Sequence, residues 1–225
     1  MMPLETTARS PLVSQVISQL REQITRGEWA VGARIPPEPE LAAQLGVGRN
    51  TLREAVKALS HAGLLDCRQG SGTYVLAASE LSSAVARRIA DAEFRDVLEV
   101  RRAFEVEAAR LAARRRTPLD LEALDLALAR REEMWRTGDA ARFVEADSAL
   151  HEVVVATAHN KVLADLYADF GTALRASLRH VVGEELTPDS YVDHTRLVDA
   201  IRAGDEDAAA FEAQCFLKET STEEG

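Results

Sequence analysis

The sequence is poor in the residues that define several common classes of protein. It has only two cysteines in 225 residues, so we expect no disulfide framework and a reducing, cytoplasmic setting. No charge-free apolar run approaches the ~20 residues that cross a bilayer, and residues 1–10 do not resemble a secretory signal. Proline is scarce, whereas 46% of the residues are hydrophobic, which indicates folded domains.

Charge is distributed unevenly along the chain, whose net charge is −10. Residues 1–78 hold eight Lys and Arg against seven Asp and Glu, whereas residues 79–225 hold 19 against 30. A near-neutral head on an acidic body can still bind DNA if its few cations share one face. The overall acidity therefore does not exclude nucleic acid as a partner.

The first third of the chain predicts a winged helix-turn-helix. Hydrophobic periodicity and Gly and Pro breaks indicate helices over residues 13–24, 40–45 and 49–62 and strands over 64–68 and 73–76. The two strands are joined by Gln69-Gly70-Ser71-Gly72, which is typical of a hairpin. We assign this DNA-binding domain to residues 1–78.

The rest of the chain predicts an all-α bundle of six or seven helices, so the protein is mainly α. Expected helix breaks are Thr117-Pro118, Gly138, His159-Asn160, Gly183, Thr187-Pro188 and Gly204. We expect a linker and connecting helix over residues 79–92, and an all-helical domain over 93–225. The Ala- and Arg-rich stretch Ala108–Arg116 is interpreted as a solvated helix end.

A row of cations is predicted on the helix that begins near Arg49. Arg49, Arg53 and Lys57 recur every four residues, opposite the apolar face of the same helix. Asn50 and Thr51 stand at its N-terminal end, where a recognition helix contacts base edges and backbone N–H groups can hold a phosphate. The alternative is an ordinary amphipathic helix with a solvated basic face.

Three side chains of the body predict a polar cluster inside the bundle. Asp147 and His151 are four residues apart within an apolar helical face, and His194 is expected on the apolar face of a later helix. Buried polar groups need partners, which a divalent metal or an Asp–His hydrogen bond would supply. Arg101 is also on an inward face, where its guanidinium needs a carboxylate from the protein or from an acidic ligand.

Motifs of the head extend the prediction. They are Glu40-Leu41-Ala42, Leu45-Gly46-Val47, Leu52-Arg53-Glu54-Ala55, Gly63-Leu64 and Gly70-Ser71-Gly72-Thr73. In this order, over residues 35–75, they resemble the winged-helix head of GntR-type bacterial transcription regulators. The resemblance implies that the recognition helix contacts bases and phosphates and that the wing glycine approaches the minor groove. It implicates Arg49, Asn50, Thr51, Arg53 and Gly70.

The head departs from the family pattern at three positions. Pro37 replaces a helix-capping Ser, Pro39 replaces an Arg that contacts the DNA backbone, and Gly48 replaces a Ser or Thr. Each change removes a hydroxyl or a cation that could contact DNA or cap a helix. We therefore expect fewer phosphate contacts than the family pattern provides.

The body resembles the effector domain of the FadR-like (FCD) branch of the same family, over about residues 93–220. The resemblance implies that the helical domain over 93–225 is an effector-binding and dimerisation domain. The matching pieces include Glu99-Val100-Arg101, Asp147 and His151, His159-Asn160, and His194 through Gly204-Asp205. Many members bind a divalent metal such as Zn, Ni or Mn through one Asp and three His. The resemblance places three of these ligands at Asp147, His151 and His194, but the fourth position is Phe216.

Together these features predict an effector-responsive bacterial transcription regulator that is not an enzyme. We expect a homodimeric repressor that binds a pseudo-palindromic operator and responds to a small organic acid held by Arg101, Asp147, His151 and His194. A metal-sensing regulator is one alternative. A helical metallohydrolase is another, although no general base such as that of a His-Glu-x-x-His motif accompanies the three residues.

The scarcity of phosphate-binding groups can be tested at Pro39. Pro39→Arg should make the fall of log K for DNA with log salt steeper, by ~0.9 for each added phosphate contact, because each contact releases counterions. The measurement is a salt titration of operator binding for the wild type and the variant. An unchanged slope would contradict the interpretation.

Overall fold

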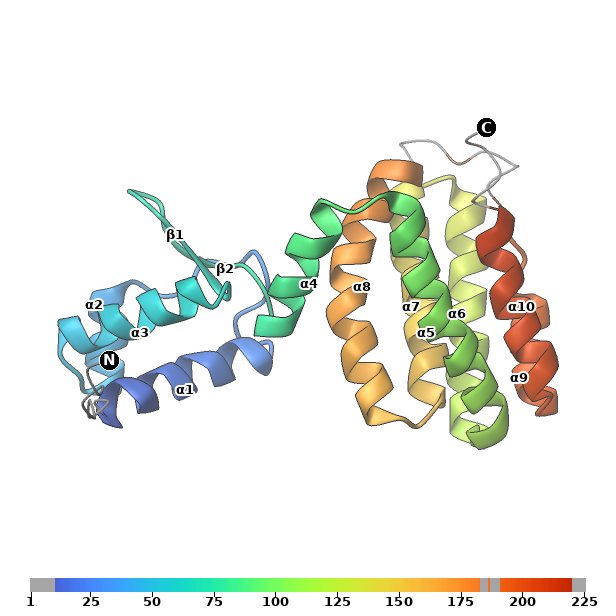
Figure 1. Ribbon diagram of the computed structural model, residues 1–225, viewed down its shortest axis with the longest axis horizontal. Helices are drawn as coiled ribbons and strands as arrows, with labels where there is room; N and C mark the ends of the chain where they lie inside the picture. The colour runs from blue at the N-terminus through green and yellow to red at the C-terminus, as the bar shows by residue number, and fades with distance from the viewer. Residues whose placement is uncertain (1–10, 183–185, 187–190, 220–225) are drawn as a thin grey trace, which may run out of the picture. The chain divides into compact units, whose positions relative to one another are not determined.

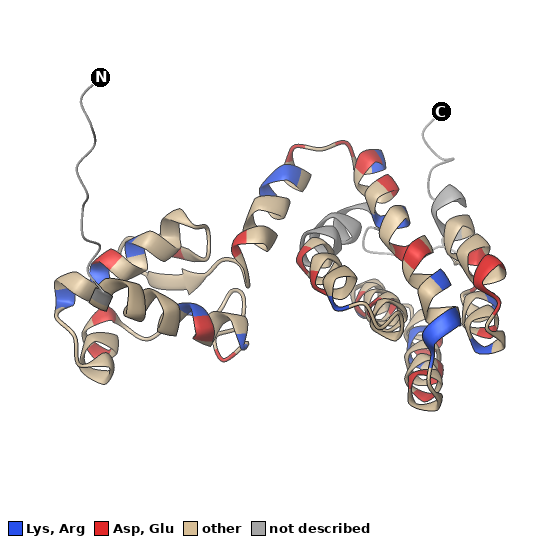
Figure 2. Cartoon of the chain, turned by 60° about the horizontal axis from the view of Figure 1, so that its bottom comes forward, with Lys and Arg blue, Asp and Glu red and all other residues tan. Residues whose placement is uncertain are grey.

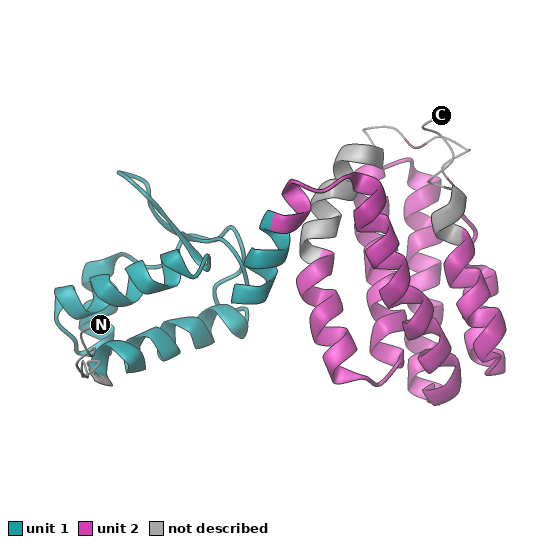
Figure 3. Ribbon diagram, viewed as in Figure 1, with its two compact units in different colours: residues 1–87 teal, residues 88–225 magenta. Residues whose placement is uncertain are grey.

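The computed structural model describes residues 11–182, 186 and 191–219, with side chains described for 12–171, 186 and 191–215. This part of the chain forms two compact units, residues 1–87 and 88–225 (Figure 3). The predicted mainly α architecture, a winged helix-turn-helix followed by a helical bundle, is confirmed. None of the described helices is both long and apolar enough to cross a membrane.

The first unit contains three helices and one hairpin. They are α1 (Pro11–Thr25), α2 (Glu38–Leu45), α3 (Arg49–His61), β1 (Leu65–Arg68) and β2 (Gly72–Val75) (Figure 1). One apolar core holds them together, to which α1, α3 and the first wing strand contribute Val16, Leu20, Ile24, Leu52, Val56, Leu59 and Leu65. Those on α1 and α3 recur at helical spacing and form the inward face of each helix, as the periodicity predicted.

Helix α2 begins earlier than predicted, at Glu38 rather than Glu40. Pro37 occupies the N-cap position and makes no side-chain hydrogen bond there, and Pro39 lies in the first turn, where a missing N–H costs nothing. The corner that follows depends on Gly46, whose φ of 65° is left-handed and ends α2. Proline therefore replaces a capping hydroxyl without preventing the helix-turn-helix geometry.

The wing is a two-stranded antiparallel hairpin. Leu65 pairs with Val75 and Arg68 with Gly72, and Gly70 turns the chain with φ 74°. A bridge from Arg34 to Tyr74 adds a third, short pairing beside β2. The hairpin is thereby attached to the segment between α1 and α2.

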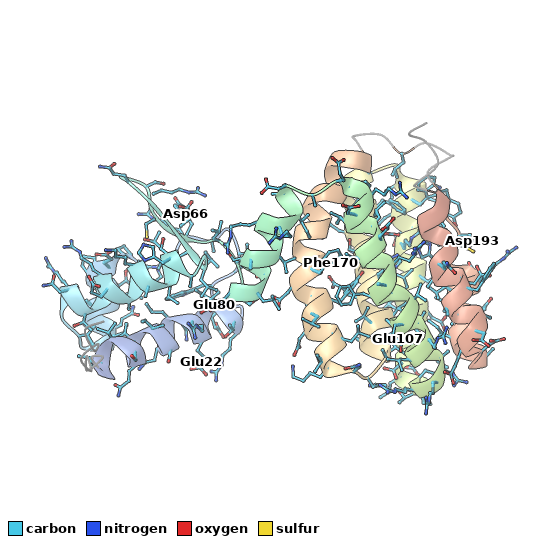
Figure 4. All side chains as sticks on the ribbon, viewed as in Figure 1. Glu22, Asp66, Glu80, Glu107, Phe170 and Asp193 are labelled. Carbon is cyan, nitrogen blue, oxygen red and sulfur yellow. The ribbon has the colours of Figure 1, made fainter. Side chains whose placement is uncertain are left out.

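Helix α4 (Glu80–Ala90) leaves the first unit at a close contact with the turn after α3. A Cβ added to Gly63, which has φ 78°, would lie 2.1 Å from Ser83 Oγ. Glu80 stands at the start of α4 (Figure 4). It accepts a 2.7 Å hydrogen bond from Arg21 of α1. The division between the two units falls inside this helix, after Arg87.

The second unit contains six helices in its described part. They are α5 (Phe94–Arg115), α6 (Pro118–Thr137), α7 (Ala140–Thr157), α8 (Lys161–Val182), α9 (Thr195–Ala203) and α10 (Glu206–Glu219). Sequence signals set several boundaries: Thr117 and Asp120 form a capping box for α6, and Gly138 and Gly204 end α6 and α9 in left-handed conformations. Of the predicted breaks, Gly183 and Thr187-Pro188 lie outside the described residues.

The interpretation of Ala108–Arg116 as a solvated helix end is correct for its arginines and wrong for its alanines: α5 ends at Arg115, and Arg114 and Arg115 in its last turn are exposed. Ala108, Ala109, Ala112 and Ala113 are fully buried, because their small side chains let α5 pack closely against neighbouring helices. The arginines that follow bind other elements: Arg115 donates to the carbonyl of Ala158 and Arg116 to that of Arg202. Both carbonyls lie at helix C-termini, where cations are stabilising.

The contact between α3 and α4 can be tested at Gly63. Gly63→Ala should lower the free energy of unfolding by roughly 2–4 kcal/mol, because a left-handed φ and a clash with Ser83 add together. Gly27→Ala is the matched control, since Gly27 has φ 76° and nothing within 4 Å of its added Cβ. Urea unfolding of both variants measures the difference. Equal losses for the two would mean that the close contact contributes nothing.

Candidate functional site

The outer face of α3 carries the predicted row of cations. Arg49, Arg53 and Lys57 are all exposed, whereas Leu52 and Leu59 on the opposite face are fully buried. Within the first unit, Lys and Arg are interspersed with Asp and Glu (Figure 2). Arg53 is held by Glu38, whose Oε2 lies 3.0 Å from its Nε. That ion pair aligns the guanidinium but leaves it accessible, with 65% of the side chain exposed.

The N-terminus of α3 offers backbone donors. Gly48 is its N-cap in an extended conformation and provides no side chain for the first N–H groups. Asn50 is exposed beside these groups and Thr51 is half-buried. A helix start of this kind can donate hydrogen bonds to a phosphate oxygen from outside the protein.

The wing adds a cation that the sequence reasoning missed. The guanidinium of Arg68 lies 4.5 Å from the centre of the Tyr74 ring and its Nε is 2.8 Å from Asp66. Gly70, at the tip, is exposed as expected. The pairing of Asp66 with Tyr74 across the two strands brings these three side chains together.

In the second unit the structure brings Asp147, His151 and His194 together. One ligating atom of each lies within 4.8 Å of the others, and the two Nε2 atoms are 3.2 Å apart. Asp147 and His151 come from α7, as predicted. His194 was expected within a later helix, but it is the residue before α9 begins; it still points inward and is 3% exposed. Asp147 keeps 18% of its side chain exposed, whereas both imidazoles are buried.

Hydrogen bonds orient both imidazoles. His194 Nδ1 lies 3.0 Å from the carbonyl oxygen of Val192, which can only accept, so this nitrogen carries a proton. Burial, opposed by the charge of Asp147, lowers the pKa of His194 to about 3. The ring is therefore neutral near pH 7, and its Nε2 presents a lone pair to His151.

Glu105 fixes the other imidazole. Burial alone would raise the pKa of Glu105, but the charges of Arg101 and His151 lower it to about 2. This side chain is therefore a carboxylate. Its Oε2 accepts from His151 Nδ1 at 3.3 Å. The Nε2 atoms of both histidines thus face each other at 3.2 Å, and both also face the carboxylate of Asp147.

Two of the three donors already have the spacing that one divalent metal ion requires, and the Asp147 oxygens lie 3.8 and 4.0 Å from the two Nε2 atoms. Two nitrogens bound at ~2.0–2.1 Å to one ion lie about 3–3.4 Å apart, and the two Nε2 atoms here are 3.2 Å apart. Both Nδ1 atoms are hydrogen-bonded to oxygen acceptors, the arrangement that usually supports ligating histidines. The fourth position of the predicted set, Phe216, has a side chain outside the described residues.

Arg101 is paired inside the protein. Its Nε lies 2.6 Å from Glu105 Oε1, and one terminal nitrogen is 3.8 Å from Asp147 Oδ2. Tyr167 of α8 also donates to Glu105, at 2.6 Å. Of the two predicted partners for Arg101, a protein carboxylate is therefore present, and Arg101 lies next to the three-residue cluster rather than apart from it.

Arg131 of α6 is a second buried cation that the sequence reasoning missed. It is 1% exposed, and its Nε donates to Asp147 Oδ1 at 2.7 Å. Its guanidinium lies 4.8 Å from the centre of the Phe143 ring and 5.7 Å from that of Tyr191. Seven residues after the fully buried Leu124, it shares the inward face of its helix, and that periodicity is the signal that could have identified it.

The buried pair on α5 can be tested by removing Glu105. Glu105→Ala should lower the free energy of unfolding by about 3–5 kcal/mol, because it leaves Arg101 buried without its nearest carboxylate. Glu99→Ala is the matched control on the same helix: it breaks an exposed pair with Arg95 and should cost about 0–1 kcal/mol. Chemical denaturation monitored by circular dichroism compares them. If both variants lose equally little, Glu105 does not balance a buried charge.

Comparison with known families now gives this geometry a context. The family model described as "Bacterial regulatory proteins, gntR family" matches residues 12–75. The model described as "FCD domain" matches residues 96–217, which is more than half of the chain. The first match covers α1 to the wing, and the second covers all three residues of the cluster, Asp147, His151 and His194.

Named relatives cover nearly the whole chain. A galactonate operon transcriptional repressor of Escherichia coli is 31% identical over 87% of this chain and 89% of its own. The transcriptional repressor NanR of Cronobacter sakazakii is 32% identical over 93% of this chain and 84% of its own. An uncharacterised helix-turn-helix regulator of Mycobacterium tuberculosis is 31% identical, with 93% and 88% covered.

A solved structure supports the same assignment. The Streptococcus agalactiae protein GntR is 27% identical, and the alignment covers 92% of this chain and 98% of that one with a TM-score of 0.53. Domains and relatives alike are those of DNA-binding regulators and not of enzymes, which confirms that prediction. The chain belongs to the GntR family of bacterial transcription regulators, with a DNA-binding head followed by an FCD effector domain.

Proposed function

We propose that this protein is a homodimeric repressor whose hold on its operator is changed by a small organic acid bound in the FCD domain. The observation that carries the proposal is the cluster of Arg101, Asp147, His151 and His194 inside the domain that the family uses for effectors. Repression is supported by the relatives, two of which are repressors. A protein that binds bacterial DNA works in the cytoplasm, so we propose that location as well.

The DNA-binding surface consists of α3 and the wing. We propose that α3 enters the major groove, where Arg49, Asn50, Thr51, Arg53 and Lys57 contact bases and phosphates. Gly70 lets the wing approach the minor groove, because no side chain stands at its tip. Two copies related by a two-fold axis would read two half-sites of a pseudo-palindrome.

The effector site is built around Asp147. A divalent ion such as Zn²⁺, Ni²⁺ or Mn²⁺ held by Asp147, His151 and His194 would offer oxygen atoms of an acid an electrophilic binding position. Arg101 stands beside the same carboxylate and can pair with the acid, provided that it exchanges part of its contact with Glu105. An acid that binds two arrangements of the dimer unequally shifts their populations and so the affinity for DNA.

Replacement of Asp147 tests the proposed site. Asp147→Asn should abolish the response of operator binding to organic acids, while affinity for DNA without acid stays within about twofold. Fluorescence anisotropy with duplexes selected from a random library, titrated with sugar acids such as galactonate and short hydroxy acids such as lactate, measures both quantities. The wild type should show a 5- to 150-fold change in affinity, the usual range of such couplings.

Asp165→Asn serves as the control, because Asp165 is exposed on α8 and pairs with Lys161. It should respond like the wild type. A normal response in Asp147→Asn would show that the effector binds elsewhere.

A further inference from the structure

Among the described residues, Arg131 is the most deeply buried of the charged side chains around Asp147, which are Arg101, Glu105, Arg131 and Glu132. The exposure of Arg131 is 1%, so its charge needs counter-ions close by. Asp147 Oδ1 lies 2.7 Å away and Glu132 Oε1 lies 3.0 Å away. Glu132 is 24% exposed and also accepts from Tyr191, so Asp147 is the more enclosed of the two counter-ions.

Protein groups already more than balance the two guanidinium charges. Arg101 pairs with Glu105, and Arg131 pairs with Asp147 and with the partly exposed Glu132. The imidazoles aside, these two cations and three anions sum to a charge of −1. A divalent ion bound at the two Nε2 atoms would add two positive charges next to Arg131, which itself cannot lose its proton.

The carboxylate of Asp147 would therefore have to serve both Arg131 and the metal ion. A metal ion bound to Asp147 would weaken the attraction between this carboxylate and Arg131. The ion would also be repelled by the guanidinium of Arg131, because a low dielectric strengthens the repulsion between like charges. We propose that Arg131 competes with a divalent metal ion for Asp147 and keeps the metal affinity of this cluster low. This inference rests on the ligand site proposed above. Tight uptake of the ion then requires an anion that compensates the added charge.

This competition makes metal and organic acid bind cooperatively. An acid brings the missing negative charge, so each ligand raises the affinity for the other by the same factor. Arg131 thus acts as a specificity-determining residue: it discourages a response to the ion alone and favours one to ion and acid together.

The direct test is a titration of the chelator-treated, full-length protein with Co²⁺, followed by its visible absorption and by calorimetry. Arg131→Gln should bind Co²⁺ at least tenfold more tightly than the wild type. Arg131→Lys keeps the charge and should stay close to the wild type. Arg130→Gln is the matched control, because this neighbouring arginine is exposed on the same helix. Affinity in Arg131→Gln that is equal to or weaker than wild type would overturn the proposal, as would equal tightening in Arg131→Lys.

If Arg131→Gln does not fold, a measurement on the wild-type protein tests the competition between Arg131 and the metal ion. Acetate should tighten Co²⁺ binding by the wild type at least tenfold, since it supplies the compensating charge. Unchanged affinity with acetate would contradict the competition. The regulator function itself is judged separately by the response of operator binding to acids, so the two proposals can fail independently.

Discussion

The carboxylate of Asp147 is the point on which the second unit is organised. Arg131 from α6 binds one of its oxygens, Arg101 from α5 approaches the other, and both imidazoles of the cluster face it. Through Glu105, which binds Arg101, His151 and the hydroxyl of Tyr167, the same network reaches α8. Five separate segments of the chain thus meet at one group of charges.

Such a network contributes little to stability relative to an apolar core of the same volume, because desolvation offsets much of the attraction between its ions. The network instead allows a ligand to replace some of its ion pairs. Every member is held by another member, so a ligand that pairs with one side chain must release or satisfy its neighbours. A small acid can thereby alter contacts on several helices at once, which is what a domain that controls DNA binding requires.

Local sequence signals predict the elements well. Gly46, Gly138 and Gly204 end helices where expected, and Thr117-Pro118 begins one, because capping and left-handed turns depend on neighbouring residues alone. The alternation of apolar and charged residues on α3 likewise places its basic row on the outside. Apolar periodicity also brought Asp147 and His151 to the right face.

Contacts between distant segments could not be predicted in the same way. Nothing near Arg131 in the sequence names Asp147 as its partner, since the pairing depends on how α6 lies against α7. Arg101 was left with two possible partners for the same reason. Helical periodicity predicted correctly that His194 points inward, but His194 precedes α9 and is not part of a helix, so the periodicity is not the cause of its direction. The helix end near Arg115 was predicted correctly, but the burial of the alanines before it was missed, because alanine is common on buried and on exposed faces alike.

The central claim is that Asp147, His151 and His194 form the ligand site of the effector domain. Crystals of the full chain grown with Co²⁺ and acetate, measured at the cobalt absorption edge, test it most directly. The account predicts an anomalous peak at ~2.0–2.2 Å from the Nε2 atoms of His151 and His194, with acetate density beside Arg101. A peak at another place, or no peak while the two imidazoles remain hydrogen-bonded to each other, would contradict it.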